Sequence, residues 1–140
     1  MQPAIASTEL ANAETASYVQ FSDEIFIDCR QRLITYLVKL NQALDQNAQD
    51  LSHALLSRFC DSLVDYLSAG HFRVFQRLVP APHEYAAIES TTQAAMAFND
   101  AFGDLRQIEV TRVKQSLEPL AQLLSSRFEL EDDIMLSASG

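Results

Sequence analysis

The chain has 140 residues, of which 48% are hydrophobic and 3 are glycines, so it has the length of one ordinary domain and a composition that favours helices over a many-stranded sheet. Nineteen acidic residues against ten basic ones leave a formal charge of −9, which argues against direct nucleic-acid binding and favours a basic protein partner. No apolar run approaches the roughly 20 residues that span a bilayer, and the chain does not start with a basic and then apolar leader, so we expect a cytoplasmic protein without a membrane segment.

The first elements in the chain are a polar segment and a helix. Residues 1–17 are rich in Ala, Ser and Thr and have no stable apolar stripe, which predicts a flexible segment. From there, 18–140 is expected to form a single helical domain. Over 21–44 the apolar residues recur at heptad spacing, which predicts an amphipathic helix. The aligned residues are Phe26, Leu33, Leu37, Leu40 and Leu44.

Three further helices are expected. The second, with the strongest apolar pattern, runs from about Leu51 past Gly70 to about Val79, where two prolines follow. A third covers about 84–102, and the last covers about 104–136. Pro119 lies inside the last helix, so we expect either a kink there or a fresh start capped by Ser116. Long helices joined by short loops predict an all-α fold, an antiparallel four-helix bundle with a loose N-terminal segment.

The second helix carries the candidate binding residues. At about 100° per residue, Asp65, Ser68 and Phe72 fall on one face, opposite the apolar row. Asp61 precedes Asp65 by one turn, and the four residues together are called the Phe72 face. An acid, a hydroxyl and an aromatic at this spacing are typical of a recognition surface. The alternative is that Phe72 packs under a neighbouring helix and that Asp65 is an ordinary solvated charge.

The segment Ser68-Ala69-Gly70 has little side-chain bulk. A glycine inside a helix costs about 1 kcal/mol relative to alanine, so Gly70 is expected to have a packing reason or a docking reason. Another backbone could approach the helix closely at this point.

Two opposite charges fall on apolar rows. Arg30 shares a row with Leu37 in the first helix, and Glu131 lies in the apolar row of the last one. They are a candidate interior ion pair, because either charge buried alone would cost several kcal/mol. The alternative places both at an open end of the bundle, where their charges reach water.

Catalytic motifs are missing from the sequence. Helical bundles that hold a di-metal centre need Glu-x-x-His pairs on facing helices, and the chain has none; His53, three residues after Asp50, is the nearest approach. The sequence also lacks a Gly-rich phosphate loop and a nucleophile elbow. We therefore expect no enzyme activity, cofactor or metal. Cys29 and Cys60 are expected to be buried, unpaired thiols.

One segment carries a family resemblance. Residues 59–72, FCDSLVDYLSAGHF, closely resemble the most recognisable segment of the regulator-of-sigma-D family, Rsd/AlgQ. Two more segments agree in the same order, ESTTQ with FND over 89–100, and RFELED over 127–132. Relatives carry Asp-Arg-Trp early in the first helix, where this chain has Asp23 to Asp28 with Phe26 near the place of the Trp.

The resemblance implies a fold, a partner and a site. Family members are four-helix bundles that bind the C-terminal, promoter-recognising domain of the primary sigma factor and keep it from core RNA polymerase. The family residues that match Asp65, Ser68 and Phe72 lie in that contact. Members also engage a phosphotransfer carrier protein, so the alternative is a signalling adaptor without strong sigma binding. The sequence leaves the oligomeric state open.

Overall fold

The computed structural model describes residues 2–139, with side chains described for 21–138. Over 2–139 the chain forms helices and no strand, so the all-helical prediction is confirmed. The elements are α1 (Gln2–Asp45), α2 (Gln49–Ala69), the π-helix η1 (Gly70–Phe75), α3 (Gln76–Leu78), α4 (Pro82–Phe102) and α5 (Val110–Ser139).

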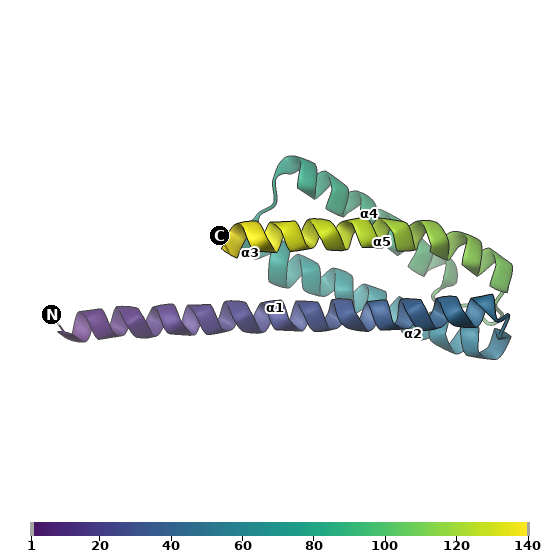
Figure 1. Cartoon of the computed structure of the whole chain (residues 1–140), viewed down its shortest axis with the longest axis horizontal. Helices are drawn as coiled ribbons and strands as arrows, with labels where there is room; N and C mark the ends of the chain where they lie inside the picture. The colour runs from purple at the N-terminus through teal and green to yellow at the C-terminus, as the bar shows by residue number, and fades with distance from the viewer. Residues whose placement is uncertain (1, 140) are drawn as a thin grey trace.

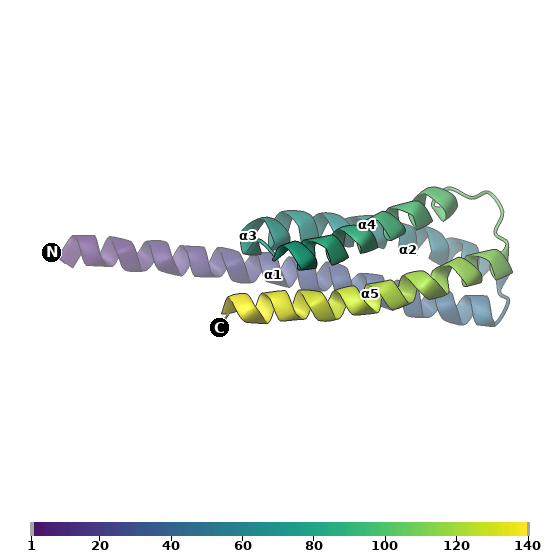
Figure 2. The ribbon, with the colours of Figure 1, turned by 90° about the horizontal axis from the view of Figure 1, so that it is seen from above.

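The helices lie side by side as an elongated bundle. Short connections reverse the chain between consecutive long helices, so that α3 and the end of α5 lie at one end and the α1–α2 and α4–α5 connections at the other (Figure 1). The N-terminal half of α1 extends beyond the other helices in both views (Figure 2). Over the described residues, no helix combines the length and the apolar character needed to cross a membrane.

The first helix is longer than the sequence pattern predicts. It begins at Gln2 rather than near 21 and has 44 residues. Its early part contains several alanines, and its proline, Pro3, lies in the first turn, where the missing N–H has no intrahelical partner. A helical backbone is therefore compatible with this segment without an amphipathic pattern. The flexibility of 1–17 stays a prediction.

The second predicted helix is continuous but contains a change of type. The backbone is α-helical to Ala69, π-helical over 70–75 and α-helical again to Leu78. Val79 then adopts a left-handed conformation, with φ of 45°, so the helix ends at Leu78, two residues before Pro80. Pro82 begins α4 rather than preceding it, because a proline is tolerated in the first helical turn.

The last helix begins later than predicted, at Val110 instead of 104. Residues 103–109 form the α4–α5 connection, and two side chains of α2 bond to its backbone. Gln49 donates to the Ile108 carbonyl at 3.1 Å, and a ring nitrogen of His53 lies 2.6 Å from the Leu105 carbonyl oxygen. The predicted fresh start at Ser116 is wrong, because α5 runs through Pro119 without a break.

The core lies where all the long helices meet. Edge-to-face contact between Phe59 of α2 and Phe98 of α4 joins two of them, with ring centroids 5.6 Å apart. Cys29 and Cys60 are both free thiols, as predicted, but Cys29 is half-buried instead of buried. The largest apolar side chains that are almost fully buried are Phe26, Leu33, Leu40, Leu56, Phe59, Leu63, Val74, Val113, Leu117 and Leu124.

Candidate functional site

The residues of the Phe72 face lie on the outer side of the second helical segment. Asp61, Asp65 and Ser68 are exposed, and Phe72 keeps 66% of its surface accessible. The alternative in which Phe72 packs under a neighbouring element is therefore wrong. The Phe72 ring makes an edge contact with the neighbouring His71 ring, with centroids 4.8 Å apart. All four residues of the Phe72 face are therefore accessible to solvent, on successive turns of one helical segment.

The π-helix changes how the residues after Phe72 are placed. A π turn advances each residue by a smaller angle than an α turn does, because it closes i to i+5 hydrogen bonds. Val74 and Phe75 are consecutive, yet both are buried. Phe72 lies between these inward residues and the α-helical part of the face, and it still faces solvent. The π-helix therefore turns the Phe75 ring inward and leaves the Phe72 ring exposed.

Gly70 has a packing reason. A Cβ atom there would lie 3.2 Å from the Phe75 ring, 3.3 Å from the Phe26 ring and 3.6 Å from the Arg127 guanidinium. Gly70 and Ala69 are buried, and the nearest neighbours of such a Cβ atom are side chains of the same chain. Phe26, near the place of the family's Trp, is fully buried under the π-helix.

The two interior charges predicted from the apolar rows lie close together. An Arg30 guanidinium nitrogen is 3.4 Å from a Glu131 carboxylate oxygen, and a second Arg30 nitrogen is 2.8 Å from Asp132. The Glu131 side chain is 0% exposed and that of Arg30 is 15% exposed. The alternative in which both charges reach water is therefore wrong for Glu131.

The surroundings of Glu131 include residues that the sequence analysis did not single out. Arg127, one turn earlier, donates to Glu131 at 3.2 Å, to the Thr92 hydroxyl at 2.7 Å and to the Ile88 carbonyl at 3.3 Å. Tyr66 donates its hydroxyl to the same carboxylate. Arg127 lies in the apolar row of the last helix, one turn before Glu131. This position is the sequence signal that could have identified it. We call Arg30, Tyr66, Thr92, Arg127 and Glu131 the Arg127 network.

Burial sets the direction of the pKa shift for Glu131 and Tyr66 in this network. It raises the pKa of Glu131, against the opposing effects of the Tyr66 hydroxyl and of the Arg127 and Arg30 charges. It also raises the pKa of Tyr66, and the charge of Glu131 adds to that shift. For Arg30, burial lowers the pKa, but the bonds and charges of Asp132 and Glu131 outweigh it and the net shift is upward. The bonds of the Arg127 network therefore connect polar groups of α1, α2, α4 and α5 inside the bundle.

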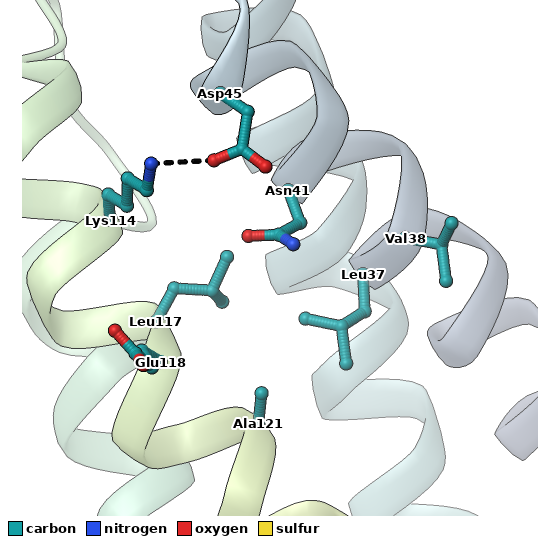
Figure 3. Close-up of a pocket in the computed structure, with 8 residues that line it drawn as sticks. All are labelled: Leu37, Val38, Asn41, Asp45, Lys114, Leu117, Glu118 and Ala121. Carbon is teal, nitrogen blue, oxygen red and sulfur yellow. Dashed lines mark ion pairs between the residues drawn. The ribbon is translucent and has the colours of Figure 1, made fainter.

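A separate hollow lies at the other end of the bundle, between α1 and α5. It has a volume of about 400 Å³, and Leu37 and Leu117 lie opposite each other across it (Figure 3). An ion pair between Lys114 and Asp45, with 2.6 Å between nitrogen and oxygen, spans its rim. Among the residues whose side chains are described, no group of three or more His, Cys, Asp or Glu residues is arranged to hold a metal ion.

Comparisons with known proteins agree with one family. The profile of the family described as "Regulator of RNA polymerase sigma(70) subunit, Rsd/AlgQ" matches residues 8–138. A protein named regulator of sigma D from Yersinia enterocolitica is 31% identical over 99 residues, 61% of this chain and 59% of the relative. One of the same name from an Enterobacter species is 33% identical over 100 residues, 63% of this chain and 61% of the relative.

These matches are partial in length. The matched part spans about three fifths of the curated relatives. No solved structure matches the chain.

Proposed function

The chain belongs to the Rsd/AlgQ family of regulators of the RNA polymerase sigma(70) subunit, and from this membership we propose that it binds the primary sigma factor and limits its use by RNA polymerase. The contact is proposed to be with the C-terminal, promoter-recognising domain of sigma. No catalytic step is needed, because occupying the surface that reads the promoter is enough to prevent its use.

The observation that carries the site is the exposure of Phe72. A large aromatic ring that is 66% exposed, flanked by Asp61, Asp65 and Ser68, has the composition of an interface anchor with a polar rim. The chain carries a charge of −9, whereas a domain that binds DNA presents a basic surface. An acidic bundle is therefore suited to compete with DNA for that surface.

The test is the variant Phe72→Ala, measured for binding to the isolated C-terminal sigma domain and for thermal unfolding. Truncation of an aromatic anchor typically costs about 2 kcal/mol or more, which is about thirtyfold in affinity. Because the ring is mostly exposed, the free energy of unfolding should change little. We therefore expect a strong loss of binding by a protein that remains as stable as the parent.

Two further variants calibrate this result. Leu51→Ala removes an exposed apolar side chain near the start of the same helix, and we expect binding and stability near those of the parent. Phe59→Ala removes a fully buried ring and should cost about 3 to 5 kcal/mol of stability. If Phe72→Ala behaves like Phe59→Ala, with unchanged binding per folded molecule, the proposed site is wrong.

The same binding assay distinguishes the signalling adaptor from the sigma regulator. A phosphotransfer carrier protein replaces the sigma domain in a parallel titration with the parent protein. Binding of the carrier without binding of the sigma domain would replace the proposed function by the adaptor role. Binding of sigma that depends on Phe72 supports the regulator.

A further inference from the structure

Arg127 joins α4 and α5 to the buried side of the helical segment that carries the Phe72 face. Its guanidinium bonds to Glu131 in its own helix α5 and to Thr92 and Ile88 in α4. The same group lies 5.3 Å from the centre of the Tyr66 ring and 5.6 Å from that of the Phe75 ring. A planar, charged group with rings and hydrogen bonds around it holds one orientation.

One of those two rings precedes the π-helix, and the other belongs to its last residue. Tyr66 belongs to the last α-helical turn of α2, and Phe75 is the last residue of η1. The Arg127 guanidinium also approaches Gly70, the first residue of η1. Arg127 therefore lies close to both ends of the π-helical turn that contains Phe72, and it is itself only 3% exposed.

A π turn is a rare backbone form that occurs mostly as a single turn inside an α-helix. In a continuous α-helix each residue from 71 onward would be rotated further around the axis, and Phe75 would leave the place in which it faces Arg127. The exposed ring of Phe72 would be rotated relative to Asp65 and Ser68 at the same time. The contact between Arg127 and Phe75 thus favours one arrangement of the face.

We propose that Arg127 is a positioning residue for the Phe72 face, holding the π-helical turn and with it the direction in which the Phe72 ring projects beside Asp65 and Ser68 toward the partner. This inference rests on the proposed binding of the sigma factor. Arg127 does not touch the partner, and its contribution is preorganisation, since a turn already in its bound form loses less entropy on binding.

The central variant carries Arg127→Met and Glu131→Gln together. Replacing both members of a buried ion pair by neutral residues of similar size is often tolerated, whereas removing one member leaves a buried charge alone. The glutamine retains an oxygen to accept the Tyr66 hydroxyl, and Arg30 keeps Asp132 at 2.8 Å. We expect faster amide hydrogen exchange in 70–75 and sigma-domain binding about threefold to tenfold weaker, as for one or two side chains that must be ordered on binding.

A double-mutant cycle separates positioning from simple stability. Phe72→Ala is measured in the parent and in the Arg127→Met, Glu131→Gln background. If Arg127 positions Phe72, the loss caused by Phe72→Ala is smaller in that background, because the ring is already misplaced. The matched control is Lys114→Met, which removes the Lys114–Asp45 ion pair at the other end of the bundle and should leave the effect of Phe72→Ala unchanged.

The results of the cycle distinguish failure of the positioning role from failure of the proposed function. Additive losses, with 70–75 exchanging as in the parent, overturn the positioning role and leave the regulator function intact. Full binding by Phe72→Ala in the parent removes the Phe72 face and the positioning role with it. If the double variant does not fold, Arg127→Lys carries the same cycle, because it keeps the charge but lacks the planar fork that reaches Glu131 and Thr92 at once.

Discussion

Cys60 illustrates how a single side chain is controlled by its place in the bundle. It lies on the inner side of α2 and is 3% exposed. Burial, with a smaller contribution from the charge of Asp61, raises the pKa of its thiol to about 12. Since the thiolate is the nucleophile, Cys60 is in its unreactive protonated form at every pH well below that value.

We therefore predict selective alkylation of the native protein at pH 8. Iodoacetamide should modify the half-buried Cys29 first, and Cys60 should react only as fast as the fold opens. In denaturant both thiols should react at similar rates, which is the control for accessibility. Mass spectrometry of timed samples measures the order. Equal native rates for the two cysteines would contradict the burial of Cys60.

At this scale the sequence predicts exposed positions better than buried polar ones. The exposure of Asp65, Ser68 and Phe72 follows from helical periodicity, because a residue on the outer side needs no partner from another helix to be exposed. The partners of Glu131 depend on how α2, α4 and α5 meet. The bond from the Tyr66 hydroxyl to Glu131 depends on how α2 packs against α5 and has no sequence signal.

At the scale of elements, the ends of helices also depend on contacts with other helices, which the sequence does not show. Residues 104–109 lie in a plausible helical pattern, but the carbonyls of Leu105 and Ile108 contact His53 and Gln49 of α2. Tertiary contacts therefore override local propensity. The π-helix over 70–75 has no simple sequence pattern either, because it depends on the packing of Phe26, Phe75 and Arg127 around Gly70.

The end of α3 offers a test at this scale. Val79 has φ of 45° and is 70% exposed, although β-branched residues rarely adopt this conformation. Asparagine tolerates it, and Asn47 already occupies the same region, with φ of 55°. We expect Val79→Asn to raise the free energy of unfolding by about 1 kcal/mol.

Thermal or urea unfolding measures that gain. Val38→Asn is the matched control, since Val38 is an exposed valine inside α1 and the two residues have similar helix propensities. It should leave stability nearly unchanged. A loss of stability in Val79→Asn would mean that the exposed valine makes a contact worth more than the backbone strain.

For the whole molecule, the excess of acidic residues has a kinetic consequence. A charge of −9 should speed association with a basic domain at low salt, and the effect should fade as salt screens it. Asp65→Asn should lower the association rate and flatten its dependence on salt, because it removes a charge from the proposed contact. Stopped-flow mixing with the sigma domain at several salt concentrations measures both.

The control for this experiment is Asp104→Asn, which makes the same change in net charge. Asp104 is exposed in the α4–α5 connection at the opposite end of the bundle from α3. Its removal should have a clearly smaller effect on the rate and on the salt dependence. If the two variants are equal, association depends on net charge and not on the position of Asp65.

The length of α1 also determines how the molecule moves. At 1.5 Å per residue, the 44 residues of α1 extend about 66 Å, whereas the 30 residues of α5 extend about 45 Å. The two helices lie along the same long axis (Figure 1), so α1 adds a thin rod to a compact body. Rotation about the long axis is therefore faster than end-over-end rotation, and tumbling in water is anisotropic.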